Sequence, residues 1–342
     1  MLAATVRVHA IIEPMPANDR MPCVWSRRSL LVALAAGSFA VLSGCRVQLE
    51  EDAPQIPLVP TRVPMKDEKA LLALLGRTTS LRSLAEAIGG APTSMTGQLS
   101  AVHATQVAVI ARLLRDGGVP ESTIGASRTA PATAAPTTTA PPTSASPTRP
   151  PLAPLAMLSA AERDSVSDVS LGDVSNTHVA LIGSMMAQRS AAVTLLGGTA
   201  PPVARAGLIG AEAARLLEAA RAAVYGFEIV AAQIDRTGRA LAMSTLSSLR
   251  THASELQTMV GSSATPAPLG YQLPFSVTDG GSARRLALHL LEALLIRQAS
   301  ALAPATGHAT SLTTLVQWLG ATEAVATRWG SRLTAFPGLT NG

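Results

Sequence analysis

Cysteine is nearly absent from this chain of 342 residues, which holds only Cys23 and Cys45. The cysteines and histidines do not show the spacing of a structural zinc site. A disulfide framework is excluded too, because we expect Cys23 to leave with an export signal and Cys45 to carry lipid. The fold must therefore be stabilised by its own apolar core.

Aromatic residues and basic clusters are also scarce. Aromatics make up 3% of the chain, and the formal net charge is only +5. Loss of residues 1–45 would lower this charge to +3, because the segment holds four basic and two acidic residues: Arg7, Arg20, Arg27, Arg28, Glu13 and Asp19. Nucleic-acid-binding domains need basic patches and usually stacking rings. We therefore expect no nucleic-acid partner.

Recognisable catalytic motifs are missing as well. The sequence has no nucleophile elbow, no phosphate-binding glycine loop and no Cys/His zinc spacing. The segment GLIGAE at 207–212 follows no predicted strand, so it does not indicate a dinucleotide site. These absences favour a non-enzymatic protein without a cofactor, although they leave an enzymatic activity open.

No apolar run is long enough to cross a membrane. The longest informative run, Leu30–Leu42, has 13 residues, which span roughly 20 Å as a helix against a hydrocarbon core of about 30 Å. It follows two arginines and ends in the small residues Ser43 and Gly44. This order is typical of a secretory signal peptide, predicted here at residues 1–44. The true start is expected at Met15 or Met21.

Two short motifs refine this prediction. The segment around Arg27 and Arg28 resembles the twin-arginine export motif, although general secretion remains the alternative. Leu42-Ser43-Gly44-Cys45 resembles the lipobox of bacterial lipoproteins. The resemblance implies that the Cys45 thiol takes a diacylglycerol and that its new amino terminus can be acylated, with palmitate as the expected acid. A chance match beside a buried helix is the alternative.

Apolar periodicity begins after a proline-rich tether at residues 45–65. Leucines recur at three-to-four spacing within residues 66–118, and Gly89-Gly90 and Gly117-Gly118 interrupt the pattern. This predicts a helical hairpin with glycine at the helix ends. Residues 119–157, rich in Pro, Thr and Ala, are predicted to form a disordered linker. Residues 158–200 are expected to form helices that complete this N-terminal module.

Four long helices are predicted in residues 201–342. The first, within 211–234, carries a seam of alanine and larger apolar residues, and a second seam follows within 242–260. Two more helices are expected at about 282–302 and 311–329. Such seams favour close antiparallel packing, and no strand pattern competes. The predicted fold class is all-α, with a smaller helical module before a four-helix bundle.

The C-terminal half resembles a ferritin-like domain family of unknown function found mainly in actinobacterial lipoproteins. The resemblance is carried by AAVYGFEIVAAQI (222–234), YQLPFSVTDGGSARRLALHLLEAL (271–294) and ATRWGSRLTAFPGL (326–339). It covers roughly residues 205–340 and implies a ferritin-like four-helix fold without an established activity.

The residues for a ferritin-type metal site are present only in part. Di-iron bundles use a Glu-x-x-His motif on two helices, whereas this chain has the reversed pairs His252/Glu255 and His289/Glu292. The candidate iron ligands under this alternative are Glu228, His252, Glu255, His289, Glu292 and Glu323. His252 and Glu255 flank the predicted seam. We therefore expect the four carboxylates to lie at the edge of the bundle, in water: Glu228, Glu255, Glu292 and Glu323. His103 and His178 either share an ion or haem, or are hydrogen-bonded interior histidines.

The function expected from the sequence is an exported, lipid-anchored helical protein of the cell envelope. It would sit on the extracytoplasmic face of the cell membrane and bind an unidentified protein or small ligand without catalysis. The alternative is a ferritin-like protein that binds or oxidises iron.

The lipidation of Cys45 gives the first testable prediction. Replacing Cys45 with Ala should release the protein from membranes or leave an unprocessed precursor, because the acceptor thiol is lost. Membrane fractionation and gel mobility measure this outcome. A variant that fractionates and migrates like the wild type would contradict the lipoprotein prediction.

Overall fold

The structure is a computed structural model that describes residues 62–129, 153–167, 169–199, 207–208 and 211–339. The signal peptide, Arg27, Arg28, Cys45 and most of the tether lie outside the described residues. The described part is helical and contains no strand, which confirms the all-α class for these residues. Its α-helices are α1 (Glu68–Ile88), α2 (Met95–Asp116), α3 (Glu121–Thr129), α4 (Pro154–Ser167), α5 (Val179–Leu195), α6 (Ala211–Gln233), α7 (Arg239–Val260), α8 (Gly280–Ser300) and α9 (Ala309–Arg328).

Two short 3-10 helices complete the described elements, η1 (Leu171–Asp173) and η2 (Gly261–Ser263). Within the described ranges, no helix is both long and apolar enough to serve as a membrane span.

Side-chain caps begin two of the helices, and a glycine ends another. The Ser94 side chain caps α2 by accepting a hydrogen bond from the Gly97 amide at 3.2 Å. Asp279 caps α8 in a capping box with Ser282, which satisfies amides that the first helical turn leaves unpaired. Gly89 ends α1 with a φ of 75°, a conformation that favours glycine. The predicted glycine stop after this helix is confirmed.

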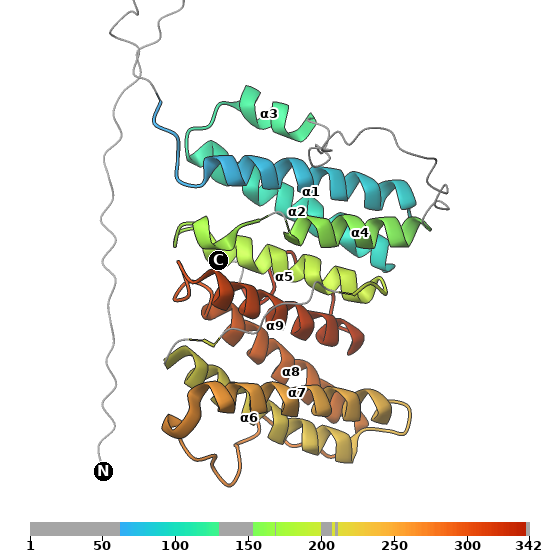
Figure 1. The fold of residues 1–342 in the computed structure, drawn as a ribbon. Helices are drawn as coiled ribbons and strands as arrows, with labels where there is room; N and C mark the ends of the chain where they lie inside the picture. The colour runs from blue at the N-terminus through green and yellow to red at the C-terminus, as the bar shows by residue number, and fades with distance from the viewer. Residues whose placement is uncertain (1–61, 130–152, 168, 200–206, 209–210, 340–342) are drawn as a thin grey trace, which may run out of the picture. The chain divides into compact units, whose positions relative to one another are not determined.

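The helices from Arg62 onward form one compact unit. Helix α1 contacts α2, α3 and α4. From α4 the contacts continue helix by helix to α5, α9, α8, α6 and α7, in that order (Figure 1). One apolar core runs through this series, from Leu71 on α1 to Leu291 on α8. Helices from both sides of the predicted border at residue 201 therefore share a core.

Helix α9 lies very close to α5. A Cβ atom added at Gly320 would be 2.6 Å from the Ala187 carbonyl oxygen and 3.0 Å from the Ser190 Cβ. Such distances leave no room for a side chain, so glycine is required for this approach. The contact fixes one face of α9 against the N-terminal helices.

Part of the predicted linker is helical. Helix α3 lies within 119–157, where the fully buried Ile124 anchors it to the core. Helix α4 begins earlier than expected, at Pro154, since proline is well tolerated in a first helical turn. Residues 130–152, the most proline-rich part, lie outside the described residues.

A buried polar network joins α1, α2, α4 and α5. His103 Nε2 lies 2.7 Å from Glu162 Oε1, and its Nδ1 lies 3.1 Å from Gln106 Oε1. The Gln106 amide donates to Gln188 Oε1 at 3.0 Å and to the Ala335 carbonyl at 2.8 Å. Side chains from three helices thereby hold the segment that follows α9.

Arg189 completes the buried polar network. Its guanidinium is fully buried and donates to Ser165 Oγ and, at 2.6 Å, to Thr78 Oγ1. Burial lowers the pKa of Arg189 to about 10, and the Glu162 carboxylate opposes this shift, so the side chain stays charged at neutral pH. Arg189 Nε and Glu162 Oε2 find no hydrogen-bond partner among the described residues. The Glu162 carboxylate therefore offsets part of the cost of burying the Arg189 charge.

The buried polar network gives the second prediction. Glu162→Gln keeps the side-chain size but removes the charge that compensates Arg189, so it should lower the free energy of unfolding by about 3 kcal/mol. Urea unfolding measures this change. Glu86→Gln, which removes an exposed partner of Arg82, is the matched control and should leave stability nearly unchanged.

The same experiment includes the double variant Glu162→Gln with Arg189→Met. Its loss of stability should be smaller than the two single losses together, because both buried charges are gone. Strictly additive losses would show that Glu162 and Arg189 are not coupled.

Candidate functional site

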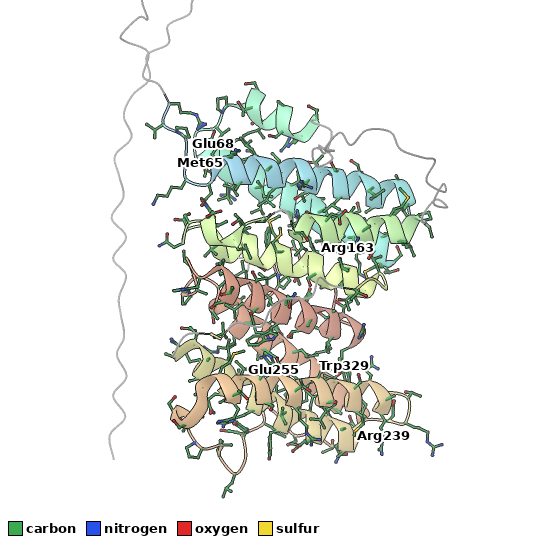
Figure 2. All side chains as sticks on the ribbon, viewed as in Figure 1. Met65, Glu68, Arg163, Arg239, Glu255 and Trp329 are labelled. Carbon is green, nitrogen blue, oxygen red and sulfur yellow. The ribbon has the colours of Figure 1, made fainter. Side chains whose placement is uncertain are left out.

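A cavity of about 320 Å³ lies between α7, α8 and α9. Its apolar wall comes from all three helices: Leu249 on α7, Leu291 and Leu294 on α8, and Trp318 and Val325 on α9. Figure 2 shows Glu255 of α7 and Trp329, which follows α9, in the space between the α7 and α9 ribbons. Small-molecule sites in proteins have this mostly apolar, concave character.

Helix α7 turns His252 toward this cavity. Thr245, Leu249, His252 and Leu256 follow each other at spacings of four, three and four residues, which places them on one helical stripe. Thr245, Leu249 and Leu256 are buried, and the first three members line the cavity. His252 is half-buried, and its neighbour Ala253 packs against the core, so His252 flanks the predicted seam and also lines the cavity.

His252 is neutral and has one unused ring nitrogen. Its ring packs edge-on against Trp318, with centroids 4.4 Å apart. Burial lowers the pKa of His252 to about 4. Its Nε2 atom is buried and has no hydrogen-bond partner in the described part of the chain. An unsatisfied buried polar atom costs about 1–3 kcal/mol, so this nitrogen lowers the stability of the fold.

Gln298 lines the same cavity and has a second unused polar atom. The residue is 1% exposed, and its Oε1 atom has no hydrogen-bond partner among the residues described. The neighbouring hydroxyls are already engaged. Thr245 Oγ1 accepts from Trp329 Nε1 at 3.1 Å, and Thr322 Oγ1 donates to the Trp318 carbonyl at 2.9 Å. His252 Nε2 and Gln298 Oε1 are thus two buried polar atoms of lining residues that have no hydrogen-bond partner among the described residues.

The cavity carries little charge. Of the described residues that line it, none is a lysine or arginine, and Glu255 is the one carboxylate. Glu255 is half-buried. The site therefore offers apolar contact and hydrogen bonds but no cation to pair with an anionic ligand.

The six metal candidates do not gather at one point. Within the described ranges, no group of three or more His, Cys, Asp or Glu side chains is placed to hold a metal ion. Only His252 and Glu255 line the cavity. Glu228 is exposed and pairs with Arg250 at 2.8 Å.

The remaining three candidates have other surroundings. His289 is exposed, with its ring centroid 6.4 Å from that of Phe275, and Glu292 is exposed on the same helix. Glu323 is 1% exposed and accepts hydrogen bonds from the Thr334 amide at 2.9 Å and hydroxyl at 3.0 Å. Burial raises the pKa of Glu323. Its expected place in water is therefore wrong, because the segment after α9 folds back over it.

His103 and His178 are both hydrogen-bonded and buried, and they have different partners. His103 belongs to the buried polar network, whereas His178 Nδ1 lies 2.8 Å from Asp67 Oδ2. The interpretation of each as a hydrogen-bonded interior histidine is confirmed.

Sequence comparison places a known domain over this site. The family described as Domain of unknown function (DUF4439) matches residues 212–341. The match includes nearly all of α6 and the whole of α7, α8 and α9, and with them every residue that lines the cavity. No curated protein and no solved structure matches the chain. A DUF4439 domain is thus present, and it contains the candidate site.

The lowered pKa of His252 gives the third prediction. At neutral pH its imidazole is uncharged in both the folded and the unfolded state. As the pH falls below the ordinary value of 6.5, the unfolded chain takes up a proton that the folded chain accepts only near pH 4. Folding stability should therefore decline between these values, by up to about 3 kcal/mol from this group.

Urea unfolding across this pH range measures the decline. His252→Phe keeps a ring against Trp318 and should remove this part of the pH dependence. His289→Phe makes the same change at an exposed site and should leave it intact. Identical pH dependence in the wild type and both variants would show that His252 titrates as a solvated group.

Proposed function

We propose that this chain is a lipid-anchored binding protein of the cell envelope that holds a small ligand between α7, α8 and α9. In this proposal Cys45 anchors the chain to the extracytoplasmic face of the membrane, and α6–α9 form a ferritin-like four-helix bundle. The observation that carries the proposal is the mostly apolar cavity of about 320 Å³ that residues of α7, α8 and α9 line.

The size of the cavity supports a small ligand. A protein cavity of about 150 Å³ is large enough to bind benzene, and drug-sized sites begin at about 300 Å³. The volume of about 320 Å³ therefore suits a molecule with one ring or a short chain. The apolar wall would supply most of the binding free energy.

Binding without catalysis fits the chemistry of the lining. Among the described residues, no serine, threonine or cysteine side chain is hydrogen-bonded to the neutral His252, and the neighbouring Thr245 and Thr322 hydroxyls already have partners. General acid–base catalysis needs a group whose pKa lies near the working pH, whereas that of His252 is about 4.

Iron binding is the alternative function, and His252 with Glu255 is the feature that favours it. A ferritin-type centre also needs further inward carboxylates, but Glu228 pairs with Arg250 and Glu323 accepts from Thr334. Under the proposal, elemental analysis of the purified protein should find no stoichiometric iron. Two irons per chain would favour the alternative instead.

The fourth prediction tests ligand binding directly. Calorimetry of the full chain with toluene and benzyl alcohol should detect one site per chain for at least one of them. Ala321→Trp should abolish this binding, because Ala321 lines the cavity and is exposed, so a large side chain there can fill the cavity from its rim.

Ala293→Trp is the matched control, since Ala293 is exposed on α8 and does not line the cavity. This variant should bind like the wild type. Failure of the wild type to bind either compound, or equal binding by the Ala321 variant, would contradict the proposed site.

A further inference from the structure

A groove of about 540 Å³ lies between α2 and the segment that follows α9, and we call it the α2 groove. One wall is α2, where Gln98, Val102 and Thr105 are spaced by four and three residues and therefore share one helical stripe. The other wall comes from the segment 332–339. Among the described residues, none lines both this groove and the cavity between α7, α8 and α9. The α2 groove is therefore a separate place for a ligand, and its volume lies within the range of small-molecule sites.

Two hydrogen bonds fix how the second wall runs along α2. The Leu333 amide donates to Gln98 Oε1 at 3.2 Å, and the Gln106 amide group donates to the Ala335 carbonyl at 2.8 Å. The α2 stretch between these two glutamines is roughly 12 Å long. Arg332 precedes Leu333, so its backbone lies at the end of the groove where α2 begins.

The two ends of the α2 groove differ in polarity. Thr93, Gln98 and Arg332 line the end at the start of α2. Val102 and Phe336, which follow further along the two walls, are buried and form an apolar floor. A molecule that matches the groove therefore has a polar end and an apolar body.

The charge at the polar end is positive. Arg332 is the one charged residue among the described lining residues, and the sequence has no Asp, Glu, Lys or other Arg within 89–111 or 329–342. Arg332 is exposed, and its guanidinium has no ion-pair partner in the described part of the chain. The nearby carboxylate of Glu323 does not line the groove, because it is 1% exposed and accepts from the Thr334 amide.

The start of α2 adds to this positive charge. The N-terminal end of a helix carries a partial positive charge that attracts anions, and α2 is a long helix of 22 residues. The arginine guanidinium also has a planar fork of N–H groups, which fits the two oxygens of a carboxylate or a phosphate. An oxyanion is therefore the group that suits this end of the groove.

We infer that the α2 groove binds a molecule with one oxyanion group, a carboxylate or a phosphate, at the end of an apolar chain. The oxyanion contacts the Arg332 guanidinium beside the start of α2. The apolar chain packs against Val102 and Phe336.

Four compounds with the same eight-carbon chain test this inference: octanoate, octyl phosphate, octanol and octylamine. Each is titrated into the full chain at neutral pH, and binding is followed by NMR. The amide signals of Val102 and Leu333 report on the α2 groove, whereas the Trp318 indole signal reports on the cavity between α7, α8 and α9. A ligand in one site is thereby distinguished from a ligand in the other.

At the groove signals, octanoate or octyl phosphate should bind at least about fivefold more tightly than octanol, as expected for a solvent-exposed ion pair. Octylamine, whose ammonium group is repelled by Arg332, should bind most weakly. Added sodium chloride should weaken the binding of the anion and leave that of octanol unchanged, because salt screens only the charged contact. Binding of octanoate alone would assign a carboxylate ligand, and binding of octyl phosphate alone a phosphate ligand.

Two variants assign the binding to residues. Arg332→Gln should lower the affinity for the anion to that for octanol, while Arg239→Gln, at an exposed position on α7, should leave the preference intact. Ala101→Trp should abolish binding in the groove, because Ala101 is exposed and lines it. Ala293→Trp is again the control for the added ring.

Equal binding of octanol and both anions, tightest binding of octylamine, or no shift of the groove signals with any compound would overturn the inference. A dimer of the chain that Ala101→Trp dissociates, measured by analytical ultracentrifugation, would overturn it too, because the groove would then be an interface between two copies. None of these results bears on the cavity that Trp318 reports, so the proposed function stands or fails separately. The wild-type series decides even if a variant does not fold.

Discussion

The close contact between α5 and α9 is the constraint on which the rest of the structure depends. It requires Gly320, where an added Cβ would lie 2.6 Å from the Ala187 carbonyl oxygen. Helix α9 therefore has one face fixed against α5, while its Trp318, Thr322 and Val325 side chains form part of the cavity wall. The position of the candidate site is thus set partly by a helix outside the DUF4439 match.

The segment that follows α9 strengthens this arrangement through hydrogen bonds. Gln106 donates to the Ala335 carbonyl at 2.8 Å, and Ser184 donates to the Pro337 carbonyl at 2.7 Å. Glu323 accepts from Thr334 on the same segment. The buried polar network and this segment therefore connect α2 and α5 to the end of the chain. In a chain that is poor in aromatic residues and has almost no cysteine, such buried hydrogen bonds replace disulfides as long-range connections.

Apolar spacing and glycine stops predicted the long helices, because both signals are local. The predicted seam residues Leu217, Phe227 and Leu246 are buried as expected. Helix α3 was not predicted, since Ile124 is a single anchor and the residues after it resemble a linker. The cavity beside α7 could not be predicted either. His252 lines it and packs against Trp318 of α9, a contact that the local sequence does not indicate.

The polar partners could not be predicted, because they come from distant parts of the sequence. No motif marks Gln298 as a residue that lines the cavity or connects Glu162 with Arg189 in the buried polar network. Glu323 resembles an exposed acidic residue until Thr334 folds over it. The type of each residue was visible in the sequence, whereas its environment depends on the tertiary fold.

The central claim is that a small, mostly apolar ligand occupies the cavity between α7, α8 and α9. A crystal structure of the full chain with benzyl alcohol tests it most directly. The account predicts density for the compound in this cavity, against Trp318. A structure in which side chains fill this space, or in which the compound binds elsewhere, would contradict it.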